Sequence, residues 1–391
     1  MSNNHAGPTV TRAPISSAPE SPEPKAAKQQ HWYRQWLIRL VMIAVGFVIA
    51  LVATEVLLRT LSLAPAGGLA TVNEREYRQL PGIYTPNQRL IDRTQPKLPF
   101  RVTIDSLGYR GTRQISRAKP AGEIRVLMLG DSFTFGYLVD DDKTMSALVE
   151  SRLQARCAAG QSIRVVNAGL GGSSIETAAV MAERALPLGI DIAVVTFSEN
   201  DVTDLADPMW VNLTANRAAK SRFPMSVVYP VVRHLALWNV LLKVEGKIRN
   251  THIASVAHPS AMTQGVAADS SLLRLRAEYR ERLSRLRDML TGANIPLLFA
   301  IAPSANTVYS DNSGEQVRWA GQTARDLGIP VVDFTPALKR DGRPKEQLYM
   351  LPIDGHPSAA GYAAAEPGLE ATLVGTPPLA QRCTSEATRP R

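Results

Sequence analysis

Four short segments of this chain hold side chains suited to catalysis, and each comes after an apolar run typical of a buried strand. They are residues 130–136 (GDSFTFG), 167–173 (NAGLGGS), 198–201 (SEND) and 354–357 (DGHP). In an open α/β sheet, binding and catalytic groups gather beyond the carboxyl ends of the strands. A serine, a histidine and a carboxylate that meet there can supply a nucleophile, a general base and a group that orients the base.

Ser132 is the candidate nucleophile, although its position also suits a helix cap. It follows the apolar residues 124–129 and stands where a helix would begin, so its hydroxyl could cap that helix. The segment does not match the G-x-S-x-G elbow of α/β hydrolases, because Thr134 occupies the place of the second glycine. It also differs from the Walker A phosphate loop and the G-x-G-x-x-G dinucleotide motif. Taken alone, Ser132 fits a helix cap better than a nucleophile.

His356 is the candidate general base. It lies in a Gly/Pro turn after the last predicted strand, with the carboxylate of Asp354 two residues before it. A neutral imidazole can take the proton of a serine, and a carboxylate can fix its tautomer and stabilise the imidazolium. The other five histidines come earlier, two before the apolar N-terminal stretch and three between the third and fourth strands: His5, His31, His234, His252 and His258.

Backbone and amide N–H groups could bind a negatively charged oxygen beside the serine. Gly169 and Gly172 leave the backbone open to a ligand, and the amide of Asn200 could point to the same place. Glycines at a strand end also form tight turns, and an asparagine can cap a helix. Each of these signals is weak alone, but the position of all four segments after strands favours a single catalytic site.

The apolar runs predict the elements that would position these residues. Helical periodicity between the runs, as in residues 272–290, favours helices that cover a parallel sheet on both faces. We therefore expect a three-layer α/β/α sandwich of the flavodoxin-like type, with right-handed crossovers. Its five strands are expected at residues 124–129, 163–166, 192–197, 296–301 and 330–334.

A stretch near the N-terminus predicts one transmembrane helix. Residues 40–54 contain no charge, and the apolar stretch covers 36–61 if three charged side chains near its ends lie at the interfaces. A cleaved signal peptide is a poorer match, because the small residues 64–66 lie ten residues beyond the uncharged core. A buried soluble helix is seldom apolar on every side over such a length.

Basic residues before this helix predict a single-pass protein of the inner (cytoplasmic) membrane with its N-terminus inside and its catalytic domain in the periplasm. The expected parts are a disordered cytoplasmic tail (1–35), the anchor (36–61), a connector docked on the catalytic domain (62–118), the catalytic domain (119–376) and a flexible tail (377–391). The long segment 202–270 inside the catalytic domain could form a lid or an acceptor groove.

Composition narrows the classes of function. The 391 residues are 45% hydrophobic and 20% charged, which suits a folded globular protein. The net charge is +9, of which residues 1–39 contribute +3, and no dense basic run with interleaved aromatics predicts nucleic-acid binding. Two cysteines exclude a disulfide-dense scaffold and a four-cysteine zinc site. Cys157 and Cys383 could pair in an oxidising compartment, or remain one buried thiol and one thiol in a loose tail.

The four segments resemble the SGNH/GDSL hydrolase family of serine esterases and acyltransferases over about residues 120–375. The anchor and residues 104–111 resemble the membrane-tethered bacterial branch of that family. The matching residues are Gly130-Asp131-Ser132, then Asn167 with Gly169 and Gly172, then Asn200-Asp201, and finally Asp354 with His356.

The resemblance implies a role for each site residue. Ser132 would be the nucleophile, His356 its base and Asp354 the orienting acid, while the N–H groups of Ser132 and Gly172 and the amide of Asn200 would form the oxyanion hole. The resemblance implies no metal and no cofactor.

Two positions depart from the usual family pattern. Ser198 replaces the glycine of the G-x-N-D motif, and the acid precedes the histidine by two residues instead of three. The shorter D-x-H form also occurs among relatives that include alginate-type O-acetyltransferases.

We therefore expect a membrane-tethered esterase that hydrolyses short acyl esters, such as acetyl esters of a cell-envelope or exported polysaccharide. Two alternatives remain. The same acyl-enzyme could pass its acyl group to a polysaccharide hydroxyl, or the fold could serve as a non-catalytic anchored scaffold. Acyl-chain length, natural substrate, oligomeric state and partner proteins do not follow from the sequence.

Overall fold

The computed structural model describes residues 25–61, 69–157, 162–206, 209–233, 235–241, 244, 264–310 and 314–383. The chain divides into two compact units, Met1–Leu57 and Leu58–Arg391. The second unit contains the sheet and every catalytic candidate named above.

The first unit consists of most of the helix α1 (Lys25–Thr60). Its part Trp32–Thr60 is long and apolar enough to cross a membrane, by length and composition alone, and none of its most apolar stretch is buried. The prediction of a disordered tail up to residue 35 is wrong for residues 25–35, which continue the helix toward the N-terminus. Alanine, lysine and glutamine, which fill most of residues 25–30, favour helices, so the helix does not end where the apolar residues end.

Five parallel strands form the sheet of the second unit, in the order β4-β3-β5-β6-β7. This is the 2-1-3-4-5 order of flavodoxin-like folds. It confirms the expected fold class, and every strand begins and ends within one residue of the predicted run. The strands are β3 (Glu123–Leu129), β4 (Ser162–Asn167), β5 (Ile192–Phe197), β6 (Leu297–Ile301) and β7 (Val331–Asp333).

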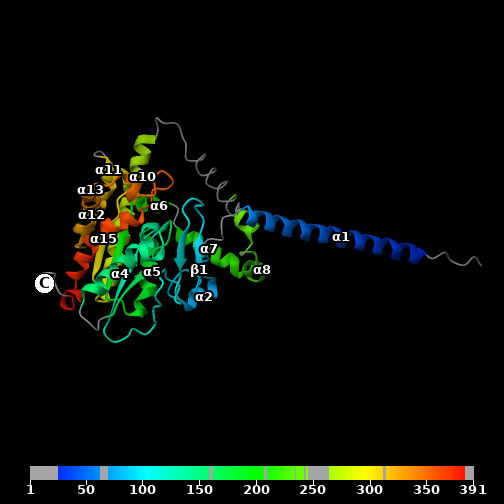
Figure 1. Ribbon diagram of the computed structural model, residues 1–391, viewed down its shortest axis with the longest axis horizontal. Coiled ribbons are helices and arrows are strands. Elements are labelled where there is room, and N and C mark those ends of the chain that lie inside the picture. The colour runs from blue at the N-terminus through cyan, green and yellow to red at the C-terminus, as the bar shows by residue number, and fades with distance from the viewer. Residues whose placement is uncertain are drawn as a thin grey trace, which may run out of the picture. The chain divides into compact units, whose positions relative to one another are not determined.

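Helices cover both faces of the sheet and make three layers (Figure 1). Successive residues of β3 point to opposite faces, so Leu127 and Leu129 pack in one hydrophobic core and Val126 and Met128 in the other. The first core is covered by α5 (Ile175–Ala185), α10 (Gln264–Gly292) and α12 (Glu315–Asp326). The second is covered by α4 (Met145–Arg156), α11 (Ala305–Tyr309), α13 (Thr335–Asp341), α14 (Lys345–Leu348) and α15 (Ala359–Val374).

Shorter elements connect the layers. Two short helices begin directly beyond strands, α3 (Ser132–Phe135) after β3 and α6 (Asp201–Asp204) after β5. Two longer ones, α7 (Met209–Ser221) and α8 (Met225–Val232), lie between α6 and α10 in the chain. The single 3₁₀ turns are η1 (Asp141–Lys143), η2 (Leu186–Leu188) and η3 (Leu379–Gln381). Within the segment 202–270, the three histidines at 234, 252 and 258 lie outside the described residues.

The segment before the sheet packs against the first core. It contains α2 (Glu74–Gln79) and an antiparallel hairpin of β1 (Arg89–Asp92) and β2 (Phe100–Thr103). Phe100, Val102 and Ile104 are buried in the same cluster as the sheet residues. A single β-bridge between Arg110 and Asn167 then joins this segment to the carboxyl end of β4.

The C-terminal end is tied to the sheet domain by a disulfide between Cys157 and Cys383. Leu379 is fully buried in the second core. The prediction of a flexible tail from residue 377 is therefore wrong for residues 377–383, while residues 384–391 lie outside the described residues. The sequence left the cysteine pairing open because the two positions are far apart in the chain and only the fold brings them together.

Candidate active site

A continuous chain of hydrogen bonds joins Ser132, His356 and Asp354. Ser132 Oγ lies 2.7 Å from His356 Nε2, and His356 Nδ1 lies 2.5 Å from Asp354 Oδ1. Because an ionised carboxylate only accepts hydrogen bonds, the imidazole carries its proton on Nδ1, and Nε2 can accept the serine proton. The side chains of His356 and Asp354 are 21% and 23% exposed, so the group is open to solvent.

A turn accommodates the short spacing between Asp354 and His356. Asp354 Oδ1 also accepts the backbone N–H of His356 at 2.9 Å. The turn is closed by Met350, whose N–H donates to the His356 carbonyl at 2.9 Å and whose carbonyl accepts the Asp354 N–H at 3.0 Å. One carboxylate oxygen therefore fixes both the ring and the backbone of the same histidine, as an aspartate two residues before its partner can do.

Two aromatic rings hold the imidazole from its sides. The ring centroids of Phe133 and Tyr137 lie 5.1 and 5.0 Å from that of His356. The hydroxyl of Tyr137 lies 3.0 Å from Thr94 Oγ1, and Thr94 in turn donates to Asp92 at 2.6 Å. Burial raises the pKa of Tyr137 although the bond to Thr94 opposes this, so the phenol stays protonated near neutral pH. The β1–β2 hairpin thus supports the histidine from outside the sheet domain.

A buried arginine, Arg110, holds the turn that follows Ser132. Its guanidinium donates to four backbone carbonyls, three of them in this turn, those of Phe135 (2.9 Å), Gly136 (2.6 Å) and Val139 (2.7 Å), and the fourth that of Arg101 (3.1 Å). It also donates to Asp141 at 3.2 Å and lies 4.6 Å from the centre of the Phe135 ring. Burial lowers the pKa of Arg110, and Asp141 opposes this effect. A guanidinium keeps its positive charge inside a protein, and these acceptors offset the free-energy cost of burying that charge.

Asn167 joins the second segment to the same turn. Its side-chain amide donates to the carbonyls of Thr134 and Phe135 at 3.1 and 3.3 Å, and its oxygen accepts the N–H of Gly169 at 3.0 Å. A Cβ on Gly169 would lie 2.2 Å from the Phe135 nitrogen, so only glycine allows the two loops to approach this closely. The close approach places the glycine-rich loop beside the serine.

The predicted oxyanion donors come from the loops around the serine. A Cβ on Gly171 would lie 3.9 Å from the Cβ of Ser132, which makes this glycine an immediate neighbour. Gly172 follows with φ +70°, in the left-handed region that favours glycine. Asn200 follows β5, and its amide donates one N–H to Asp204 at 2.7 Å. An amide has a second N–H, and the roles of Gly172 and Asn200 stay predictions.

Ser198, which replaces the family's glycine, links buried carboxyl groups beneath the site. Three oxygens lie within hydrogen-bonding distance of its hydroxyl: Asp131 Oδ2 at 2.7 Å, Asn200 Oδ1 at 2.8 Å and Asp201 Oδ1 at 2.9 Å. A hydroxyl has a single proton and donates to only one of these oxygens, and an amide oxygen cannot donate. A protonated carboxyl of Asp201 can donate to the Ser198 oxygen, which leaves the Ser198 proton for Asp131 and no proton for the contact with Asn200 Oδ1.

The electrostatics of this group agree with that assignment. Burial raises the pKa of Asp201 well above its usual range, and the charge of nearby Asp131 raises it further. Burial also raises the pKa of Asp131, while its bonds from Ser198 and from the N–H of Phe133 lower it. Two buried carboxyl groups in one polar cluster cannot both ionise easily, so Asp201 holds the proton and Asp131 carries the charge.

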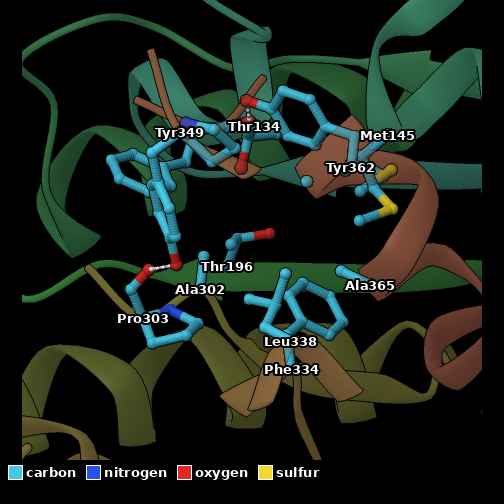
Figure 2. Close-up of a pocket in the computed structure, with 14 residues that line it drawn as sticks. Thr134, Met145, Thr196, Ala302, Pro303, Phe334, Leu338, Tyr349, Tyr362 and Ala365 are labelled. Carbon is cyan, nitrogen blue, oxygen red and sulfur yellow. Dashed lines mark hydrogen bonds between the residues drawn. The ribbon is translucent and has the colours of Figure 1, made fainter. Parts of the chain in front are cut away.

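Figure 2 shows a small apolar cavity behind the turn that carries Ser132. Thr196, Leu338 and Tyr362 are among its lining residues, and its volume is about 20 Å³. That is room for about one water molecule. The hydroxyl of Tyr362 donates to the carbonyl of Phe133 at 2.7 Å, which fixes the wall nearest the serine. The cavity is too small for an acyl chain.

The sequence predicted the serine, histidine and aspartate of the site but not the residues that hold them in place. Tyr137 has no motif, Arg110 lies in the segment 104–111 that was noted only for its resemblance, and Ser198 was noted only as a departure from a pattern. An arginine inside the strand-like residues 101–110 was a further signal, since a charged side chain in an otherwise buried segment needs partners. Among the described residues, no group of three or more His, Cys, Asp or Glu side chains could hold a metal ion.

Comparisons with known proteins agree with the resemblance in the sequence. The model of the GDSL-like lipase/acylhydrolase family matches residues 128–364. No curated protein matches the chain in sequence.

Solved structures with a similar arrangement include an acetylxylan esterase from Geobacillus stearothermophilus, with 17% identity, 63% of this chain and 92% of that chain covered, and a TM-score of 0.37. A lipase/acylhydrolase from Enterococcus faecalis has 16% identity, covers 64% of this chain and 96% of its own, and has a TM-score of 0.36.

The arginine beneath the turn gives a first prediction. Replacing Arg110→Met would remove one donor from four backbone carbonyls and from Asp141, and we expect the free energy of unfolding to fall by about 2–5 kcal/mol. Urea unfolding measures this, with Arg113→Met as the matched control. Arg113 is an exposed arginine whose pairing with Glu150 at 3.0 Å should contribute about 1 kcal/mol or less. Equal losses in the two variants would contradict the assigned role of Arg110.

The buried carboxyl pair gives a prediction on pH. A carboxyl whose pKa is higher in the folded chain than the unfolded value of about 3.9 binds more protons when folded. The free energy of unfolding therefore falls as pH rises from about 4 toward the raised pKa of Asp201. Asn cannot ionise, so we expect Asp201→Asn to lose less thermal stability than the wild type between about pH 5 and pH 8.

Thermal unfolding across that pH range measures the effect. Asp142→Asn, which removes an exposed carboxyl group, is the control and should keep the wild-type pH dependence. If Asp201→Asn kept it too, Asp201 would not hold the proton in the folded chain.

Proposed function

Because the chain belongs to the GDSL-like lipase/acylhydrolase family, we propose that it is a serine esterase that hydrolyses short acyl esters through an acyl-enzyme. The observation that carries this proposal is the chain of hydrogen bonds that joins Ser132, His356 and Asp354. The serine stands at the carboxyl edge of the sheet, where substrates of such folds bind. The other named residues support its reactivity or its position.

In the proposed mechanism, Ser132 Oγ attacks the ester carbonyl carbon as His356 Nε2 takes its proton. Asp354 stabilises the resulting imidazolium through the bond to Nδ1. The tetrahedral intermediate then collapses, and the imidazolium gives its proton to the departing alcohol. Water repeats the sequence on the acyl-enzyme, with His356 again acting as base, and releases the carboxylic acid.

We assign the oxyanion hole to the backbone N–H groups of Ser132 and Gly172 and to the side-chain amide of Asn200. Such donors act on charge that develops in the transition state, so loss of one donor typically lowers the rate by about 100-fold or more. The position of Gly171 against Ser132 supports a glycine-loop donor at this place. The bond from the Asn200 amide to Asp204 supports a fixed orientation for the amide.

Short acyl groups suit the surroundings of the serine. The cavity behind it holds about 20 Å³, which is too small for a long acyl chain. The solvent exposure of His356 and Asp354 also gives water ready access to an acyl-enzyme. We therefore place acetyl and similarly short esters first, with a glycan ester as the substrate class.

Transfer to a sugar hydroxyl is the second candidate. The observation in its favour is the D-x-H spacing of Asp354 and His356, which the chain shares with alginate-type acetyltransferases. Incubation with an acyl donor and candidate oligosaccharides, followed by mass measurement of the products, distinguishes the two reactions. If acylated sugar formed without appreciable free acid, the reaction would be acyl transfer and not hydrolysis.

Replacement of the nucleophile tests the mechanism. We expect Ser132→Ala to lower the hydrolysis of p-nitrophenyl acetate by about 10⁴-fold or more and to abolish labelling by a fluorophosphonate. Ser106→Ala, at an exposed serine, should keep both, and thermal unfolding should be similar in the two variants. Labelling of the Ser132→Ala protein would assign the nucleophile to another residue.

We further propose that α1 is retained as a single-pass anchor of the inner (cytoplasmic) membrane, with the catalytic domain on the periplasmic side. Its support is the length of the apolar part of α1 and the basic residues before it. We expect the full chain to stay in the membrane pellet after alkaline carbonate and to be digested when protease is added to spheroplasts. Carbonate should release residues 62–391 expressed alone. If expression of the full chain instead gave a shorter, soluble protein, α1 would be a cleaved signal sequence.

A further inference from the structure

A carboxylate that the proposed mechanism does not use, that of Glu199, lies beside the candidate active site. Glu199 comes two residues after β5 ends, and Ser132 comes three residues after β3 ends. The two strands are parallel neighbours, with Leu129 opposite Val195. Side chains beyond the carboxyl ends of neighbouring parallel strands share the edge of the sheet where ligands bind. Glu199 also directly precedes Asn200, to which we assign an oxyanion donor.

One oxygen of this carboxylate is fixed by the loop that follows β6. Glu199 Oε1 accepts the N–H of Ser304 at 2.9 Å and the hydroxyl of Thr307 at 2.6 Å. The other oxygen, Oε2, has no hydrogen bond or ion pair within the part of the chain that the structure describes, and it is open to solvent. The side chain is therefore held in one orientation and keeps a free acceptor.

The same loop connects Glu199 to the candidate base. The carbonyl of Pro303, at the start of the loop, accepts the hydroxyl of Tyr349 at 2.9 Å (Figure 2). Tyr349 pairs through a β-bridge with Pro357, the residue after His356. The loop that fixes Glu199 and the turn that carries the histidine are therefore held together.

The serine is connected to the other side of Glu199. Ser198, the residue before it, has its hydroxyl 2.7 Å from Asp131, which directly precedes Ser132. Glu199 is thus joined by short contacts to the segments of both the nucleophile and its base. Groups next to the ester of a bound substrate would therefore lie near this carboxylate.

We propose that Glu199 Oε2 binds a hydroxyl of the alcohol part of the substrate, next to the ester that Ser132 attacks. An ionised carboxylate only accepts hydrogen bonds, so it recognises a group that donates one. An acetyl group has no such donor, so the donor belongs to the alcohol. A carboxylate or phosphate at the same place is disfavoured, because like charges repel. The ligand class that fits is a sugar with a free hydroxyl beside its ester. The inference rests on the proposed function and adds the feature of the glycan ester that the site selects.

The substitution Glu199→Gln tests this assignment. The amide oxygen of glutamine can accept the bonds from Ser304 and Thr307, while its NH2 group replaces the free acceptor by a donor. The loop contacts are therefore kept and only the proposed binding atom changes. Two substrates are compared on the full chain in detergent. One is a monoacetate of methyl glucoside with its other hydroxyls free, and the second is the same monoacetate with those hydroxyls methylated.

We expect the wild-type enzyme to prefer the ester with free hydroxyls by about tenfold or more in kcat/KM, as a hydrogen bond to a charged group allows. Glu199→Gln should reduce this preference to about twofold or less. The ratio of the two values reports recognition, because misfolding or a displaced nucleophile would lower both. Glu183→Gln, at an exposed glutamate of α5, is the matched control and should keep the wild-type preference.

Hydrolysis of p-nitrophenyl acetate by the wild type separates this inference from the proposed function. If the wild type hydrolyses it but cleaves neither sugar ester, or cleaves both equally well, the inference is wrong and the esterase proposal stands. The same conclusion follows if Glu199→Gln keeps the wild-type preference. If the wild type hydrolyses none of the three esters, the esterase proposal fails and the inference fails with it.

Discussion

The burial of one charge, the guanidinium of Arg110, constrains the site more than any other feature. A buried cation is tolerated only if its donors are fully engaged, and this one donates to four backbone carbonyls and to Asp141. Three of those carbonyls belong to the turn that follows Ser132, so the arginine fixes the end of the short helix whose first residue is the nucleophile candidate. Because Arg110 comes from the segment before the sheet, that segment is part of the site's support. The same segment supplies Thr94, which holds Tyr137 against His356.

A second polar cluster supports the same turn from the opposite end. Asp131 caps α3 by accepting the N–H of Phe133 at 2.8 Å and receives the Ser198 hydroxyl on its other oxygen. A glycine at position 198 would leave that oxygen without this donor and would leave Asp201 without a link to it. The departure from the family pattern therefore adds a hydrogen bond to the residue immediately before the serine. The turn is thus held at its beginning by Asp131 and at its end by Arg110, with Asn167 between them.

The strands and the catalytic candidates could be predicted from sequence because each depends on a short, local pattern of residues. Continuous apolar runs identify buried strands, and the serine, glycine and asparagine segments each follow such a run directly, so their convergence needed only the topology rule for parallel sheets. Asp354 and His356 lie some twenty residues after the last strand and were predicted from their own turn pattern. The supporting residues could not be predicted in this way. The bonds of Arg110 to the turn after Ser132 and to Asp141 reach residues 25 to 31 positions away, and the contact of Ser198 with Asp131 spans 67 positions. Such pairings depend on how loops pack, which composition and periodicity do not encode. The start of α1 and the order of residues 377–383 were also not predicted. Local polarity favoured disorder at both places, but helix propensity extends α1 toward the N-terminus and the disulfide to Cys157 fixes the residues before Cys383.

The distribution of charge along the chain is compatible with the proposed membrane orientation. Residues 209–250, beyond the proposed anchor, have a net charge of +6 and could compete with the basic N-terminal residues for the inner side of the membrane. Orientation, however, is set by Lys and Arg within about 20 residues of a transmembrane helix, and long domains are translocated largely regardless of their charge. Lys25, Lys28 and Arg34 lie within that range before the apolar stretch, whereas residues 209–250 begin some 150 positions after it. The basic residues before the apolar stretch therefore set the proposed orientation, and the basic residues of 209–250 do not oppose it.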